Sequence, residues 1–330
     1  MPTIEEVAKA AGVSVATVSR VLNNGQVSPK TRILVENAIR ELNYEPNMLG
    51  RNLRRSESRM ILTMIPNISN PFYSVIVEGI EDAARKNGYN ILLCNTEADV
   101  EREKIYLDLL KQKLADGIIT MEPAIDIDVL KEVGKRYPVV QCCEYSEKIN
   151  IPYIAIDNVT AAYKATKHLL TIGHKKIALI NSDEKFMYAR QRKEGYIKAL
   201  QEFDIPVNED WIVNAGLSFE SGQRMMKYLL SLKDKPSAVF AVSDILAIGA
   251  LKTIKDEGLK VPQDIGVVGF DNIQFANMMN PTLTTIEQPR YQMGVEAAEM
   301  LIKRIKDKKQ KVENVILDHQ LIIRESTMEY

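Results

Sequence analysis

Residues 3–23 read TIEEVAKAAGVSVATVSRVLN, and this stretch predicts two short helices joined by a tight turn. Thr3 and Glu6 have the spacing of a capping box, in which each side chain bonds the backbone N–H of the other. Gly12 can adopt the left-handed conformation that ends a helix, and Ser14 is a suitable cap for the next one. This arrangement predicts a helix-turn-helix, whose second helix enters the major groove of DNA.

A third helix is predicted to complete this head. Ser28 is a suitable cap and Pro29 favours the first helical position. The apolar residues expected to face the other two helices are Ile33, Ala38, Ile39 and Leu42. Residues 1–45 are therefore predicted to form an all-α head, and a three-helix bundle without a nucleic-acid role is the alternative.

The second helix offers side chains for both base edges and phosphates. Val15 and Ala16 lie in its first turn, where they can touch thymine methyl groups, and Arg20 can bond guanine O6 and N7. Hydroxyl and amide side chains nearby are better suited to phosphate oxygens. The residues of the head expected to contact DNA are Thr3, Ser14, Val15, Ala16, Thr17, Ser19, Arg20 and Asn23.

Charge is distributed unevenly along the chain. Residues 1–59 hold nine Lys and Arg and six Glu, a net +3, whereas the whole chain has a net charge of −1. The remaining residues therefore carry −4. A basic amino-terminal part on an acidic body is consistent with phosphate binding by the head.

The head resembles the amino-terminal signature of the LacI/GalR family of bacterial repressors, and the resemblance runs the length of the chain. It is carried by residues 3–23, 27–28, 31–32 and 43–47. The resemblance implies a homodimer that represses transcription from a palindromic double-stranded DNA operator. It also implies that a small-molecule effector controls operator affinity. Whether the effector induces or corepresses is left open by the sequence, with induction expected.

Residues 46–59 are expected to form a hinge helix and linker, with a plain basic linker as the alternative. By resemblance, Leu53 matches an apolar wedge inserted in the minor groove, and Asn47 and Arg51 match positions that line groove and backbone. Gly50 departs from the alanine usual in the family.

Gly50→Ala is expected to tighten operator binding about two- to fivefold per chain, because glycine within a helix costs roughly 0.5–1 kcal/mol. Fluorescence anisotropy with labelled operator DNA measures the change. Unchanged or weaker affinity would contradict a hinge helix at this position.

From Met60 onward, apolar strands alternate with helices, which predicts an α/β body of parallel sheets covered on both faces. Strands are predicted at 60–65, 89–94, 117–121, 138–142, 153–156, 176–181, 237–242 and 265–270. Helices are predicted at 72–87, 101–113, 160–171, 190–202, 221–231, 244–257 and 290–308. The resemblance implies a periplasmic-binding-protein-like body of two doubly wound lobes within residues 60–330. The first lobe is expected at about 60–155 plus 289–312, and the second at about 156–285 plus 313–330.

Ligands of such sheets bind beyond the carboxyl ends of the strands, and this rule selects loops of the body. It selects the aromatic rings of Phe72 and Tyr73 and the polar groups that follow other strands. The resemblance adds further positions, and the complete predicted set is Asn70, Phe72, Tyr73, Glu144, Arg192, Ser243, Asp271 and Gln288. Leu217 replaces an aromatic residue common in relatives, so stacking from one side only is expected.

Several of these residues have structural alternatives. Phe72 and Tyr73 can open a core helix, Asp271 can cap a turn, and Arg192 can form a surface ion pair. Asp244 is as suitable for a helix cap as for a ligand contact. Asp157 is expected to be a cap.

Two effector classes fit this set of side chains. Residues 50–52, 57–59, 156–162, 219–222 and 283–291 are similar to a nucleoside-responsive member of the family. Asp271 and Arg192 can bridge ribose hydroxyls, a base can stack on an aromatic ring, and Glu144 can accept from an exocyclic amine. A nucleoside is preferred, and a pentose or hexose is the alternative.

Other classes of protein have little support in the sequence. His168, His174 and His319 lack metal-binding spacing, and neither a nucleotide-binding loop nor a nucleophile motif is found. No enzymatic activity, metal or cofactor is therefore expected. A transport binding protein would have no use for the head. Three cysteines in apolar runs favour free thiols in the cytoplasm. No apolar run is long enough to span a membrane.

Overall fold

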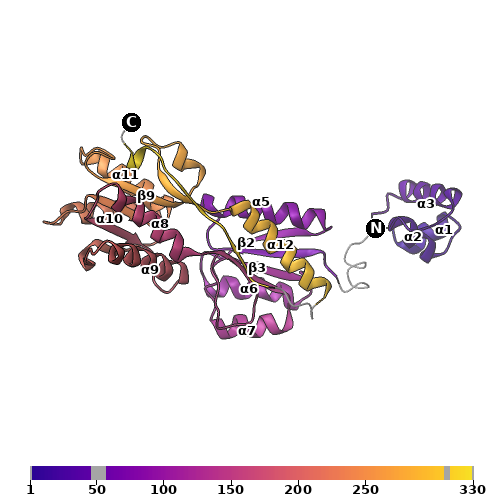
Figure 1. The fold of residues 1–330 in the computed structure, drawn as a ribbon. Coiled ribbons are helices and arrows are strands. Elements are labelled where there is room, and N and C mark those ends of the chain that lie inside the picture. Colours follow the sequence, from indigo (N-terminus) through magenta and orange to yellow (C-terminus); the bar gives the residue numbers. More distant parts are fainter. Residues whose placement is uncertain (1, 46–56, 308–312, 329–330) are drawn as a thin grey trace. The chain divides into compact units, whose positions relative to one another are not determined.

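The computed structural model describes residues 2–45, 57–307 and 313–328. The chain separates into two compact units, Met1–Ser58 and Arg59–Tyr330, which are treated one at a time (Figure 1). Asn47, Gly50, Arg51 and Leu53 lie outside the described residues, so the hinge helix remains a prediction.

The head consists of α1 (Ile4–Ala10), α2 (Val15–Leu22) and α3 (Pro29–Glu41). The predicted capping box is present, since the Thr3 N–H donates to Glu6 over 2.8 Å and the Glu6 N–H donates to the Thr3 hydroxyl over 3.3 Å. Gly12 has φ +65°, and Ser14 accepts from the N–H of Thr17. The helix-turn-helix predicted from these residues is therefore confirmed.

The core of the head is aliphatic and small. Val7, Val18, Val21 and Val35 are buried within it. The prediction that Ile33 faces this core was wrong, because its side chain is 57% exposed. Val35 takes the inward position, and two residues along a helix correspond to about 200° of rotation, which turns Ile33 outward.

The body contains two sheets of six strands each. The first sheet has the order β11-β5-β4-β3-β1-β2, formed by Val315–Leu317, Tyr153–Ile156, Val139–Cys142, Gly117–Thr120, Met60–Ile65 and Asn90–Asn95. The second has the order β12-β10-β9-β8-β6-β7, formed by Gln320–Ile322, Thr284–Glu287, Gly266–Asp271, Ala238–Ala241, Ile177–Asn181 and Ile212–Asn214. Each pairing is parallel except that of β10 with β12.

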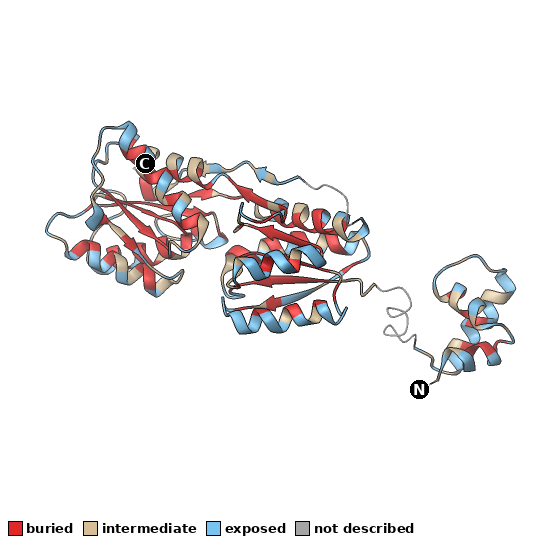
Figure 2. Ribbon diagram, turned by 90° about the horizontal axis from the view of Figure 1, so that it is seen from below, coloured by how far each residue is buried: buried red, intermediate tan, exposed pale blue. Residues whose placement is uncertain are grey.

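Helices cover both faces of each sheet, so the central strands are buried (Figure 2). In the first lobe α5 (Pro71–Lys86) packs beside α12 (Arg290–Lys306), while α6 (Val100–Lys111) and α7 (Ile127–Arg136) cover the opposite face. In the second lobe α8 (Asn158–Thr171) pairs with α9 (Met187–Glu202), and α10 (Phe219–Ser231) pairs with α11 (Asp244–Asp256). Short 3₁₀ helices occur at Glu209–Trp211, Gln274–Asn277 and Glu325–Thr327.

The chain passes between the lobes at residues 156–158, 287–290 and 317–320. The predicted assignment of 313–330 to the second lobe was wrong in part, because β11 pairs with β5 in the first sheet. Only the segment from β12 onward joins the second sheet. These strands are three residues long, which leaves too short a pattern to assign from sequence.

Helices α5 and α12 approach so closely that glycine is required between them. A Cβ atom at Gly294 would lie 2.0 Å from the carbonyl oxygen of Ile76. We expect Gly294→Ala to lower the free energy of unfolding by about 1–3 kcal/mol, the usual cost of overpacking a core. Urea denaturation measures the loss. Gly216→Ala is the control, because the nearest atom to its Cβ would be 4.0 Å away; equal stability of the two variants would contradict the prediction.

Candidate functional site

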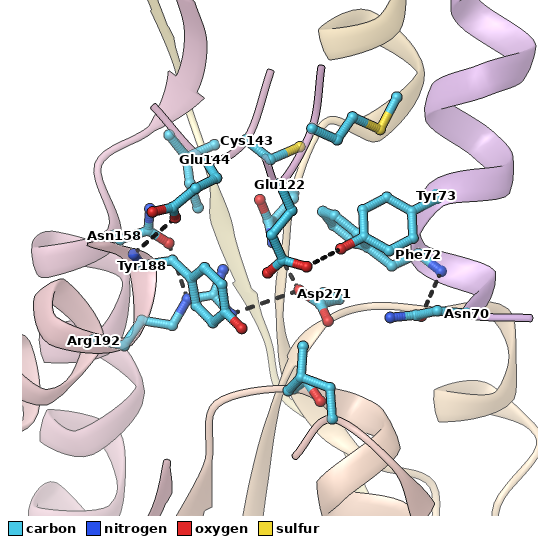
Figure 3. Close-up of a pocket in the computed structure, with 15 residues that line it drawn as sticks. Asn70, Phe72, Tyr73, Glu122, Cys143, Glu144, Asn158, Tyr188, Arg192 and Asp271 are labelled. Carbon is cyan, nitrogen blue, oxygen red and sulfur yellow. Dashed lines mark hydrogen bonds and ion pairs between the residues drawn. The ribbon is translucent and has the colours of Figure 1, made fainter. Parts of the chain in front are cut away.

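A narrow cavity lies between the two lobes of the body, where the carboxyl ends of both sheets face each other (Figure 3). The volume that it encloses is about 40 Å³. This is well below the roughly 300–1,000 Å³ usual for small-molecule sites, so the lobes must separate to admit a ligand the size of a sugar or nucleoside.

The structure gathers every body residue of the predicted ligand set around this cavity. The predicted residues that line it are Asn70, Phe72, Tyr73, Glu144, Arg192, Ser243, Asp271 and Gln288. They come from the ends of five different strands and from α9. That they bind a ligand remains a prediction, but their convergence shows that the strand-end rule located a real cavity.

Arg192 is held firmly on the wall of the cavity by α9. Its Nε donates to Asn158 Oδ1 over 2.9 Å, its Nη1 donates to the carbonyl of Val242 over 2.5 Å, and its guanidinium lies 3.6 Å from the ring centre of Phe270. The side chain is only 7% exposed, so it is not a surface ion-pair partner. Among the described residues no partner is found for Nη2, which leaves N–H donors for a ligand.

Asp271 lies opposite this guanidinium, with its Oδ1 3.9 Å from Nη1 of Arg192. The same oxygen accepts from the amide of Gln288 over 2.7 Å. Burial raises the pKa of Asp271 to about 6, although Arg192 and Gln288 favour the ionised form. Its φ of +110° is strained for a non-glycine residue, and such strain is common where the surroundings hold a functional side chain in place.

Glu144 connects the two lobes directly. It follows β4 of the first lobe, and its carboxylate accepts from the backbone N–H groups of Met187 and Tyr188 over 2.6 and 3.2 Å. These groups begin α9 of the second lobe, which has no cap of its own. Burial raises the pKa of Glu144, and both backbone hydrogen bonds oppose that shift. Its carboxylate is thus engaged by a helix end rather than held free for an exocyclic amine.

Aromatic rings line the cavity from both lobes. Phe72 and Tyr73 open α5, are buried, and meet edge to face with ring centres 5.1 Å apart. Tyr188 adds a ring from the second lobe, stacked with Phe186 at 5.6 Å and with the Arg192 guanidinium 5.1 Å from its centre. One-sided stacking of a ligand at Leu217 remains a prediction.

Other polar residues serve as helix caps or hold loops. Asn70 caps α5 and Ser243 caps α11, so both line the cavity while bonding a helix end. Asp157 caps α8, as expected. Asp244 is fully buried, accepts from the N–H of Ile273 over 2.8 Å and is not among the cavity residues, so its role is structural.

The sequence reasoning missed part of the lining. The residues not foreseen are Met121, Glu122, Cys143, Ile156, Asn158 and Tyr188. Glu122 lies two residues after the end of β3, so the strand-end rule applied to that strand would have found it. Tyr188 was missed because α9 begins at Met187, three residues before its predicted start.

On the head, the residues predicted to face DNA remain on the surface of the described unit. Five members of that set are exposed, namely Thr3, Ser14, Ala16, Arg20 and Asn23. The other three are half-buried, namely Val15, Thr17 and Ser19. Val15 is half-buried and also packs against the core of the head. The most accessible surface of α2 is therefore formed by Ala16 and Arg20.

Two of the three histidines have hydrogen-bond partners: His168 bonds the hydroxyl of Thr327 over 2.8 Å, and His174 bonds that of Ser237 over 3.0 Å. Across the residues that the structure describes, no cluster of His, Cys, Asp and Glu is arranged to hold a metal ion. None of the helices in that part of the chain is both long and apolar enough to cross a membrane.

A helix-turn-helix head followed by a two-lobed body with a polar, aromatic-lined cavity defines a DNA-binding regulator with a ligand-binding domain. Residues 3–47 match the family described as "Bacterial regulatory proteins, lacI family". Residues 58–325 match "Periplasmic binding proteins and sugar binding domain of LacI family". The chain belongs to the LacI family of bacterial regulatory proteins.

Similar proteins extend along the whole chain. It is 40% identical over 327 residues to the HTH-type transcriptional repressor CytR of Escherichia coli (strain K12), which covers 98% of this chain and 96% of CytR. The lac repressor dimer bound to operator and the anti-inducer ONPF matches with a TM-score of 0.89 and 29% identity, covering 99% of both chains. A LacI family regulator from Enterococcus faecium with bound ribose matches with a TM-score of 0.74 and 30% identity, covering 81% and 98%. These similar proteins are regulators of transcription rather than enzymes.

Proposed function

We propose that this chain is a transcriptional repressor whose affinity for its operator is controlled by a nucleoside bound between the two lobes. The observation that carries the proposal is the pairing of Arg192 and Asp271 across a cavity that also contains Phe72, Tyr73 and Tyr188. The charged pair suits the hydroxyls of a ribose, and the rings suit the flat face of a base.

A free pentose is the second candidate. Ribose would use the same charged pair, and a similar regulator is known with ribose bound. The number of aromatic rings favours the nucleoside, because a pentose alone has no planar face to stack on them. The similarity to CytR supports the same preference.

The proposed control is a shift between two arrangements of the lobes. Glu144 of the first lobe binds the start of α9 in the second, so separating the lobes would break these two hydrogen bonds. A ligand that binds one arrangement better shifts the population toward it, and only such a differential affinity can change DNA binding. We expect the effector to weaken operator binding through residues 46–59.

We propose that the protein acts as a homodimer in the cytoplasm, where its operator DNA lies. Two-fold symmetry matches a palindromic operator, and a similar repressor binds its operator as a dimer. The edge strand β2 exposes Leu92 and Leu93, 41% and 36% accessible, which offers apolar surface for a partner. Sedimentation equilibrium tests the dimer.

The proposed function is tested in two steps with the whole protein. Cytidine, uridine, adenosine and ribose are first compared for their effect on the melting temperature, which rises for any ligand selective for the folded state. The stabilising compound is then added to a gel shift with promoter DNA. Release of DNA is the expected result. Stabilisation without any change in DNA binding would contradict effector control.

A further inference from the structure

Four carboxyl side chains are buried among the described residues of the body, namely Glu103, Glu122, Asp244 and Asp271. Glu103 accepts two backbone N–H groups over 2.8 and 2.9 Å. Asp244 accepts a backbone N–H over 2.8 Å and a hydroxyl over 2.7 Å. Asp271 accepts from Gln288 and faces Arg192. Glu103 and Asp244 are thus held by hydrogen bonds away from the cavity, and Asp271 is held at the cavity beside a cation.

Glu122 differs from these three because it lines the cavity without facing a cation of the described residues. It is 9% exposed, and the hydroxyl of Tyr73 donates to its Oε2 over a long 3.3 Å. Within the part of the chain that the structure describes, no ion pair to Glu122 is found. Lys185 of the second lobe favours the ionised form of Glu122, but it is not among the cavity residues, and its side chain is 64% exposed and 3.5 Å from Asp183. The carboxyl group therefore lacks a close counter-ion.

The surroundings of Glu122 in the cavity disfavour the ionised state of its carboxyl group. Burial, and then the charge of Glu144, raise the pKa of Glu122 to about 7, although the hydroxyls of Tyr73 and Tyr188 oppose the shift. A positively charged group placed beside Glu122 would restore its ionised form. A cationic group of a ligand is therefore the kind of group that this carboxyl group would stabilise.

The position of Glu122 is fixed by its neighbours. It lies two residues after the end of β3, precedes Pro123, and leads into a loop whose N–H groups at Ala124 and Ile125 are bound by Glu103. Figure 3 shows its carboxyl group turned into the cavity, beside the ring of Tyr73. A side chain held this firmly can select among ligands by charge and geometry.

We propose that Glu122 selects an effector that carries a protonated primary amine, as in an amino sugar or an aminodeoxynucleoside. The inference rests on the proposed function and narrows its ligand class. An ammonium group has three N–H donors and no acceptor, which complements an ionised carboxylate. Glu144 and Asp271 add negative charge to the cavity, whereas Arg192 is the one cation among the described lining residues. A neutral hydroxyl at the same place would leave Glu122 protonated and would form no charge-assisted hydrogen bond.

Matched pairs of ligands test the proposal by isothermal titration with the full-length protein. The pairs are glucosamine and glucose, galactosamine and galactose, 5′-amino-5′-deoxyadenosine and adenosine, and 5′-amino-5′-deoxycytidine and cytidine. In at least one pair the amino member should bind roughly tenfold more tightly, the difference between a charge-assisted and a neutral hydrogen bond. Glu122→Gln should abolish that preference. Glu147→Gln, which alters an exposed carboxyl group outside this cavity, should retain it.

The outcomes separate this inference from the proposed function. Neutral members that bind as tightly as their amino partners, and release operator DNA, would overturn the selection by Glu122 and leave the repressor function intact. A preference for amines that survives in Glu122→Gln would also overturn it. If no member of any pair binds, both the inference and the proposed effector class are wrong.

Discussion

Arg192→Met is expected to abolish the response to the effector while leaving operator binding close to that of the wild type. The guanidinium supplies the free donors of the cavity and fixes Asn158 and Asp271 around them. Loss of one partner from a buried charged pair costs about 2–5 kcal/mol, which corresponds to roughly 30-fold or more in dissociation constant. Titration of the stabilising nucleoside or sugar into the complex with fluorescent operator DNA measures the loss.

Arg190→Met is the matched control for this experiment. Arg190 lies on the same helix, but it is exposed and donates to the carbonyls of Glu184 and Lys185 outside the cavity. We expect this variant to respond like the wild type. Arg192→Lys keeps the charge without the planar donor array, so its response should be intermediate. If the Arg192→Met protein releases DNA at the same effector concentration as the wild type, Arg192 does not bind the effector.

Much of the fold could be predicted because the decisive signals are local. The caps at Thr3 and Ser14 and the left-handed Gly12 depend on a few neighbouring residues, and all three appear in the structure. Continuous apolar runs such as those of β1 and β8 identify strands that are buried on both faces. The short strands β11 and β12 lack such runs, because they pair at the sides of sheets that are built by other segments.

The candidate site was predicted in outline for a different reason. Parallel strands place their carboxyl ends at one edge of a sheet, so loops distant in sequence meet there without any local signal between them. The contacts that depend on the docking of two lobes were not foreseeable. Glu144 caps α9 across the cavity. No sequence pattern near residue 144 or 187 indicates that these two segments are in contact.

Arg20→Ala is expected to remove most of the sequence discrimination of the head without disturbing the body. Val18 and Val21 point into the core of the head, which leaves Arg20 exposed on the opposite side of α2. A bidentate contact between arginine and guanine is worth roughly 1–3 kcal/mol for each half-site, so a dimer on a palindrome loses that amount twice. Gel shifts with operator and with scrambled DNA should show specific affinity falling toward the non-specific value.

Arg40→Ala separates loss of a base contact from loss of charge. Arg40 is exposed on α3, where it donates to the side chain of Asn37 over 2.7 Å, and its removal lowers the charge of the head by the same amount. If Arg20 reads a base, its variant loses discrimination between operator and scrambled DNA, while the Arg40 variant keeps it. Equal weakening of both variants on both DNAs would mean that Arg20 contributes only to phosphate attraction. The melting temperature rise caused by the effector should be unchanged in both, because residues of the head do not line the cavity of the body.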